Sequence, residues 1–268
     1  MTVSATRPVV AGVDASAASF AAIRWAANEA RLRDTTLRLL HACFVEDTAA
    51  RDDGELLLEH VHRRLRRSAE VAREWAPGVR VETVVRLGLA VDLLLAESAD
   101  AALVVLGSHG LGGLRGALIG SVALRVAAGA ACPVVVVPGH RPATGGPIVV
   151  GLDASASSEH ALGFALEQAA TTGAPVHVVH AWHTGDGGTE QADLTARLAS
   201  WVRKYPDLAI TAHAVRDRSP SWALANAVPD ARLIVVGTRG RGPVAGGLLG
   251  STGNALLAHA PCPVAVVH

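Results

Sequence analysis

The chain has 268 residues, half of them hydrophobic, and its 24 Lys and Arg balance its 24 Asp and Glu. The length suits two domains of ordinary size, and the balanced charge argues against a nucleic-acid or anionic-membrane partner. Three widely spaced cysteines, no apolar core of a signal peptide in residues 1–8 and no apolar run of membrane-spanning length predict a cytoplasmic protein with reduced thiols.

Strands and helices are expected to alternate through the first half of the chain. Short, wholly apolar runs predict strands buried on both faces of a sheet, and amphipathic stretches between them predict helices. The first helix follows a cap at Ser16 or Ser19 and runs to about Arg33. The expected strands are 9–13, 37–43, 81–85, 102–106 and 133–137, and the later helices are 55–75, 89–97 and 121–130.

The second half repeats this order with a shorter connection after its second strand. The expected strands are 148–152, 176–182, 210–215, 232–236 and 263–267, and the expected helices are 156–172, 190–204, 220–227 and 251–259. Strands that alternate with helices in this way predict an α/β fold with a parallel sheet and right-handed crossovers.

An internal repeat divides the chain in two. The sequence VVAGVDAS at 9–16 returns as IVVGLDAS at 148–155, and such a repeat indicates duplicated structural units. The segment 138–147, PGHRPATGGP, is rich in Pro, Gly and polar residues and is typical of a linker. We therefore expect one domain at 1–140 and another at 146–268.

A glycine-rich segment, 107–121, also occurs twice, the second time at 237–251. Both copies have the pattern Gly, two residues, Gly, nine residues, Gly, Ser. A glycine loop between a strand and a helix N-terminus is a phosphate site, because main-chain N–H groups can approach an anion there. A Walker A loop is excluded because the only lysine is Lys204, and the dinucleotide fingerprint G-x-G-x-x-G is not met.

This pattern resembles the loop of the nucleotide-binding members of the universal stress protein family, and the resemblance covers essentially the whole chain. It implies two tandem Rossmann-like domains, each with a five-stranded parallel sheet of strand order 3-2-1-4-5 and helices on both faces. Strands 1 and 4 would then be neighbours where the order reverses, which is where such sheets bind ligands. Asp14 and the glycine loop would meet there.

The resemblance implies ATP, together with Mg²⁺, as the ligand. The residues expected to bind it in the first half are Gly12, Asp14, Ala42, Gly107, Gly110, Gly120, Ser121 and Val122. Those in the second half are Gly151, Asp153, Ala181, Gly237, Arg239, Gly240, Gly250, Ser251 and Thr252.

Several of these residues have an alternative interpretation. Asp14 and Asp153 could cap the helices that follow them, or contact the ribose and phosphates directly or through a divalent cation. The hydroxyls of Ser121 and Ser251 could cap a helix, contact phosphate, or both. The arginines Arg239 and Arg241 could contact phosphate or face water, and at the corresponding loop the first half has His109 and Arg115.

Two clusters are not expected to be functional sites. His177, His180 and His183 do not share one face of a strand, so they do not predict a metal site. Arginines 63, 64, 66 and 67 alternate with glutamates 59, 70 and 74, which predicts an ion-paired, solvated helix face. His41 and His180 are expected to be packed or hydrogen-bonded strand residues.

The sequence therefore predicts a cytoplasmic ATP-binding stress-response module, whose nucleotide occupancy changes its conformation or its binding of a regulatory partner protein. Catalytic motifs are missing, and no residue is assigned a catalytic role. The alternatives are a slow ATPase or nucleotidyl-transfer enzyme of a related α/β group, and a module that has lost nucleotide. The family resemblance also implies pairing of the two halves through their fifth strands, and a homodimer.

Overall fold

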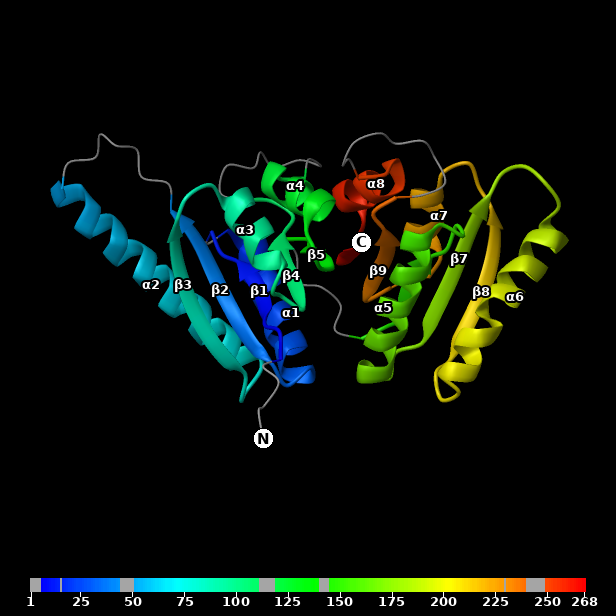
Figure 1. Cartoon of the computed structure of the whole chain (residues 1–268), viewed down its shortest axis with the longest axis horizontal. Helices are drawn as coiled ribbons and strands as arrows, with labels where there is room; N and C mark the ends of the chain where they lie inside the picture. The colour runs from blue at the N-terminus through cyan, green and yellow to red at the C-terminus, as the bar shows by residue number, and fades with distance from the viewer. Residues whose placement is uncertain are drawn as a thin grey trace. The chain divides into compact units, whose positions relative to one another are not determined.

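A computed structural model describes residues 6–14, 16–43, 51–110, 119–139, 145–228, 230–239 and 249–268, with side chains described from residue 59 onward in the segment that begins at residue 51. The chain divides into two compact units, Met1–Arg141 and Pro142–His268. Each unit is a complete α/β layer structure (Figure 1).

In the part of the first unit that the structure describes, five strands alternate strictly with four helices. Its elements are β1 Val9–Gly12, α1 Ala17–Leu32, β2 Thr36–Cys43, α2 Arg51–Trp75, β3 Arg80–Leu87, α3 Ala90–Ser98, β4 Leu103–Gly107, α4 Ser121–Gly129 and β5 Val134–Val137. The second unit repeats the pattern. Its elements are β6 Ile148–Gly151, α5 Ala156–Thr172, β7 Val176–Trp182, α6 Gly187–Lys204, β8 Ile210–Arg216, α7 Pro220–Asn226, β9 Leu233–Gly237, α8 Ser251–His259 and β10 Val264–Val267.

The strands of each unit form a wholly parallel sheet. In the first unit the order is β3-β2-β1-β4-β5, and in the second it is β8-β7-β6-β9-β10. Both are the predicted order 3-2-1-4-5, so the expected fold class is confirmed. Helices α1 and α2 pack together on one face of the first sheet, and α3 and α4 pack together on the other (Figure 1).

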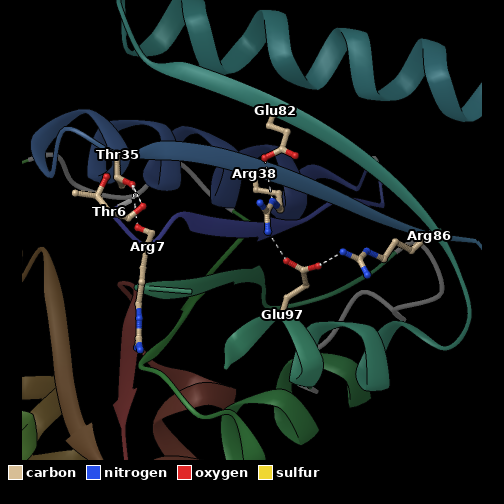
Figure 2. Close-up of polar contacts among 7 residues, drawn as sticks. All are labelled: Thr6, Arg7, Thr35, Arg38, Glu82, Arg86 and Glu97. Atoms are coloured by element: carbon tan, nitrogen blue, oxygen red, sulfur yellow. Dashed lines mark hydrogen bonds and ion pairs between the residues drawn. The ribbon is translucent and has the colours of Figure 1, made fainter. Parts of the chain in front are cut away.

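The strands owe their position to their composition. β1, β4 and β5 are almost entirely Val, Leu and Ala, and residues such as Val10, Val104 and Val135 are fully buried. Strands covered by helices on both faces have no solvent side, so a continuous apolar run is the stable solution. The N-terminal segment is held to the start of β2 by Thr35, whose hydroxyl donates to the carbonyl oxygen of Arg7 at 2.9 Å (Figure 2).

Some element ends differ from the prediction for local reasons. Helix α6 begins at Gly187 instead of residue 190, because the carboxylate of Asp186 accepts from the N–H of Thr189 at 3.1 Å and caps the helix there. Strand β1 ends at Gly12, one residue before the expected end, and β3 continues to Leu87, because it pairs with β2 as far as Cys43.

Candidate functional site

The first unit has a cavity of about 460 Å³ at the carboxyl ends of β1 and β4. This is where the strand order reverses, and adjacent crossovers leave a crevice between them. All eight residues predicted for the first half line it: Gly12, Asp14, Ala42, Gly107, Gly110, Gly120, Ser121 and Val122. The structure therefore brings the predicted set together on one surface.

Backbone hydrogen bonds close the two ends of the glycine loop. The N–H of Gly120 donates to the carbonyl of Ser108 at 2.8 Å, and the N–H of Ser108 donates to that of Val137 at 2.8 Å. The hydroxyl of Ser16 also donates to the carbonyl of His109 at 3.1 Å. The start of the loop is thus tied both to β5 and to the beginning of α1, which fixes the entrance and exit of the loop beside the cavity.

The N-terminus of α4 opens into the cavity. Its N-cap is Gly120, in an extended conformation with no side-chain cap, and the first intrahelical bond runs from the N–H of Leu124 to the carbonyl of Gly120 at 3.1 Å. The N–H groups of the first turn, at Ser121 and Val122, have no acceptor within the helix. Together with the helix dipole they form a site for an anion. The alternative that the Ser121 hydroxyl caps α4 is wrong, because Ser121 is the first residue inside the helix.

Asp14 lies against the glycine loop. Its Oδ1 accepts from the N–H of Ser16 at 2.9 Å, and a methyl group placed on Gly110 would lie only 2.7 Å from its Oδ2. The residue that caps α1 is Ser16, whose hydroxyl accepts from the N–H of Ser19 at 3.1 Å. The capping interpretation of Asp14 is therefore wrong for α1, and its carboxylate lines the cavity instead.

Gly107 is also needed for packing. A Cβ at this position would lie 2.6 Å from the carbonyl carbon of Ala18 and 2.8 Å from the nitrogen of Ser19. The end of β4 thus approaches the backbone of α1 so closely that only glycine fits. This structural requirement applies independently of any ligand, and Gly237 meets Ser157 in the same way in the second unit.

Helix α3 forms another wall of the cavity, which sequence reasoning missed. Ala90 and Leu94 line it, and their apolar spacing in the sequence predicted the helix but not the face that it covers. Figure 2 shows the carboxylate of Glu97, near the end of α3, between Arg38 of β2 and Arg86 of β3. Its oxygens lie 2.8 Å from Nη1 of Arg38 and 2.7 Å from Nη2 of Arg86. The side chain of Glu97 is only 7% exposed. These ion pairs hold α3 over the sheet.

The second unit has a smaller cavity of about 230 Å³ at the equivalent place. Eight of the nine predicted residues line it: Gly151, Asp153, Ala181, Gly237, Arg239, Gly250, Ser251 and Thr252. The ninth, Gly240, lies outside the described residues, as do Arg115 and Arg241.

The second cavity has the same internal ties as the first. The N–H of Gly250 donates to the carbonyl of Thr238 at 2.9 Å, and Gly250 is the N-cap of α8. The hydroxyl of Ser155 donates to the carbonyl of Arg239 at 3.2 Å, and Asp153 accepts from the N–H of Ser155 at 3.0 Å. Ser155 caps α5 and Ser251 is the first residue inside α8, so the capping alternatives for Asp153 and Ser251 are wrong too.

Two histidines occupy equivalent positions at the ends of β2 and β7. Nδ1 of His41 lies 2.6 Å from the carbonyl of Val13, and Nδ1 of His180 lies 2.7 Å from that of Leu152. His41 lines the first cavity, a contact that its place in a strand did not reveal, whereas Nε2 of His180 lies 3.2 Å from Glu190 of α6.

The other charged clusters have structural partners. The ring of His177 stacks on that of His213, with centroids 5.6 Å apart, and burial, followed by the nearby charge of His213, lowers the pKa of His177. Arg67 pairs with Glu70 and Glu74 on α2. Within the described ranges, no group of three or more His, Cys, Asp or Glu is arranged to hold a metal ion. None of the helices described there is long and apolar enough to cross a membrane.

Comparisons with known proteins agree with this architecture. Residues 5–138 and 146–268 each match the model of the universal stress protein family. A universal stress protein of Mycolicibacterium smegmatis is 34% identical, over 97% of this chain and 96% of its own length. One from Mycobacterium tuberculosis strain H37Rv is also 34% identical, over 96% and 95% of the two chains. The crystal structure of a universal stress protein from Archaeoglobus fulgidus has the same fold, with a TM-score of 0.78, 21% identity and 98% of both chains covered.

Proposed function

The chain belongs to the universal stress protein family, and on that premise we propose that each of its two units binds ATP with Mg²⁺. Nucleotide occupancy then changes the conformation of the chain, or its affinity for a regulatory partner protein, in the cytoplasm. The homodimer and the pairing of units that the family resemblance implies belong to the same proposal. No described residue is assigned a catalytic role.

One observation carries this proposal: the N-terminus of α4, the described ends of the glycine loop and Asp14 all line a single cavity of about 460 Å³. A cavity of this size falls in the range of small-molecule and cofactor sites. The cavity has a polar part and an apolar part: its backbone N–H groups suit an anion, whereas Leu40, Leu94 and Leu106 provide apolar walls. A nucleotide matches both parts, because it has a charged phosphate end and a flat, largely apolar base.

Asp14 explains the expected cation. Its carboxylate lies beside Gly110, at the place where phosphate would approach the loop. The Asp14 carboxylate and a phosphate bound beside it would repel each other unless a cation lay between them. Mg²⁺ is commonly held by one or two carboxylates together with substrate phosphates, so Asp14 in the first unit and Asp153 in the second would hold it. The N–H groups of Ser121 and Val122 would donate hydrogen bonds to the phosphate oxygens that the ion does not contact.

The proposal is for binding instead of rapid turnover. Enzymes that transfer phosphoryl groups use cationic side chains to stabilise the transferred charge and a group that positions the nucleophile. The single lysine of the chain, Lys204, is the last residue of α6 and lies over the rings of Trp201 and Tyr205. A slow ATPase is the alternative, and the placement of Asp14 at the cavity is the observation that favours it.

Titration calorimetry of the full chain with ATP and Mg²⁺ tests the proposal. We expect two sites of roughly micromolar affinity. Two matched variants, Gly120→Asp and Gly250→Asp, should each remove one site, because each places a carboxylate at the N-terminus of a helix that would hold phosphate. Absence of ATP binding to the wild-type chain with Mg²⁺ would leave only a module that acts through protein contacts.

The two variants are chosen so that the fold survives. The backbone of Gly120 has φ −64° and ψ 141°, and that of Gly250 has φ −59° and ψ 156°, which any residue adopts. A Cβ on Gly120 would meet its nearest neighbour, the carbonyl oxygen of Ser108, at an ordinary 3.4 Å. Aspartate is also a favoured N-cap residue. Loss of binding by a variant that keeps the wild-type melting temperature would therefore report the anion site and not unfolding.

A further inference from the structure

We infer that the two sites recognise different parts of the nucleotide: the first reads mainly the nucleoside, and the second reads mainly the polyphosphate. This inference rests on the proposed function and deepens it. Three differences between the units carry it, namely the volume of the cavities, the histidine near the end of the second strand, and the charge at one loop position.

The first difference is space. The cavity of the first unit holds about 460 Å³ and that of the second about 230 Å³. Sites that enclose a whole drug-sized ligand have volumes of roughly 300–1,000 Å³. The first cavity reaches this range and the second does not. A nucleotide bound in the second unit would therefore leave part of itself outside.

The second difference lies where the base would enter. In the first unit His41 lines the cavity. In the second unit the ring of His180 is held between the carbonyl of Leu152 and the carboxylate of Glu190, and it faces a separate cavity of about 40 Å³. When α2 and α6 are aligned on the prolines that follow them, Pro77 and Pro206, the position of Glu190 corresponds to Val61. This contact of His180 therefore depends on a residue that the first unit lacks.

Trp182 lies on the same face of β7 as His180 and packs against the start of α6. The ring of Trp182 lies against Gly187, where a Cβ would be 2.9 Å from Cζ2, and Arg216 lies 5.5 Å from the ring centroid on β8. The residue equivalent to Trp182 in the first unit is Cys43. His180 and Trp182 thus face α6, on the side of β7 opposite to Ala181, and neither lines the second cavity. Because the second cavity has no histidine where His41 lines the first, we expect less nucleoside recognition in the second unit.

The third difference is the charge at one loop position. His109 and Arg239 line their respective cavities. The carbonyl oxygen of each accepts from the serine that caps the first helix of its own unit, Ser16 or Ser155. The two side chains therefore leave the backbone from equivalent points. Arginine is always charged and can bind phosphate through two N–H groups, whereas the ring of His109 is engaged by the hydroxyl of Ser108 at 2.8 Å.

The positive charge of Arg239 affects the neighbouring side chain of His268. Burial lowers the pKa of His268, and the nearby charge of Arg239 lowers it further. A phosphate group at the N-terminus of α8 would meet this charge in addition to the helix dipole. The second unit thus has more phosphate recognition than the first, combined with less room for the nucleoside.

Displacement of radiolabelled ATP from one site at a time tests the inference. The full chain with Gly250→Asp keeps ATP at the first site, and the chain with Gly120→Asp keeps it at the second. Adenosine and inorganic tripolyphosphate are the competitors, each with Mg²⁺ present. We expect adenosine to compete at least about tenfold better at the first site than at the second, and tripolyphosphate to show the reverse order, since a charge-assisted contact changes affinity by about that factor.

Reciprocal substitutions identify the residues that cause the difference in competition between the two sites. His109→Arg should strengthen tripolyphosphate competition at the first site, and Arg239→His should weaken it at the second, by about tenfold in each case. Glu190→Val, which copies the first unit, should raise adenosine competition at the second site. The melting temperature of each variant shows whether it is folded. The tripolyphosphate results for the chains with Gly250→Asp or Gly120→Asp alone do not depend on these further substitutions.

The outcomes separate this inference from the proposed function. If ATP binds both sites and the ratio of adenosine to tripolyphosphate competition is the same at each, the inference is overturned and the proposed function stands. If the wild-type chain takes up no ATP at either site, the proposed function fails first. Opposite ratios at the two sites, reversed by the exchange of His109 and Arg239, would establish the division of recognition.

Discussion

Nη1 of Arg38 lies 2.8 Å from Oε2 of Glu97, and this ion pair connects β2 with the helix that covers the first cavity. The hydrogen bond to Glu97 is the largest cause that raises the pKa of the Arg38 guanidinium, against the opposite effect of burial. A second arginine, Arg86, binds the other carboxylate oxygen at 2.7 Å. Because Ala90 and Leu94 of the same helix line the cavity, the pair links stability to ligand binding.

Glu97→Gln should therefore lower both the stability of the chain and its affinity for ATP at the first site. We expect a loss of about 1–3 kcal/mol in the free energy of unfolding, because hydrogen bonds to charged groups contribute about this much and both arginines remain partly exposed. Urea unfolding of the full chain measures it. ATP affinity should fall at the first site alone. Glu82→Gln is the matched control, since the Glu82 side chain is 47% exposed and its pairing with Arg38 should contribute less than about 1 kcal/mol. Equal losses for the two variants would contradict this account.

Methyl groups added to two loop glycines should act differently. Gly107→Ala should destabilise the first unit, because its Cβ would overlap the backbone of α1 at Ala18 and Ser19. Gly110→Ala should leave the melting temperature nearly unchanged, since its Cβ would meet only the movable carboxylate of Asp14, and should weaken ATP binding at that site. Thermal unfolding and calorimetry of both variants decide the matter. Wild-type ATP binding by a folded Gly110→Ala chain would show that the loop does not approach phosphate there.

Removal of the Ser16 hydroxyl should affect the helix and the loop together. This hydroxyl accepts from the N–H of Ser19 and donates to the carbonyl of His109. Ser16→Ala should cost about 1–2 kcal/mol, which is typical for a lost N-cap, and should weaken ATP binding at the first site. Ser16→Thr keeps the hydroxyl and should restore most of both properties. If Ser16→Ala reduced stability but left ATP affinity intact, the tie between helix and loop would have no role in the site.

Bound ATP should be hydrolysed slowly. Asp14 and Asp153 are the carboxylates that line the two cavities among the described residues, and the only lysine of the chain is on α6. We expect phosphate release well below about one per second, the lower end of ordinary enzyme turnover. A phosphate-release assay with the full chain measures this rate. Release near that value, abolished by Asp14→Asn or Asp153→Asn, would instead support an ATPase.

Stability should decrease in mildly alkaline solution. Burial raises the pKa of the Cys132 thiol to about 11 and that of Cys262 to about 12. In the unfolded chain a thiol loses its proton near pH 8.5, so above that pH the folded state holds more protons than the unfolded state. The stabilisation is complete below about pH 8.5 and is lost as the pH rises toward 11 and 12, at up to about 1.4 kcal/mol per pH unit for each thiol.

Urea unfolding at a series of pH values checks this slope. The chain has one tyrosine and one lysine, so few other side chains titrate in the same range. The variant with Cys132→Ala and Cys262→Ala should have lower stability at neutral pH, because small cavities replace the sulfur atoms, but a flatter dependence above pH 9. An unchanged slope in that variant would assign the pH dependence to other groups.

Much of this molecule is encoded locally and could be predicted. The apolar run Val134–Val137 and the alternation of such runs with amphipathic helices specify parallel strands buried on both faces. The order of these elements leaves few topologies. The repeated glycine spacing and the aspartate after the first strand then predicted most of the cavity lining, because the topology brings the carboxyl ends of β1 and β4 together.

Other features depend on which distant segments meet, and the tertiary structure alone decided them. The need for glycine at Gly107 comes from the approach of α1, the burial of Glu97 comes from arginines on two different strands, and Leu94 reaches the cavity because α3 covers that face. The unequal cavities have the same origin. The spacing of glycines specifies that a loop can approach phosphate. The volume of the cavity beside it is set by close packing among residues far from the loop in sequence, such as Val179 of β7 and Leu224 of α7.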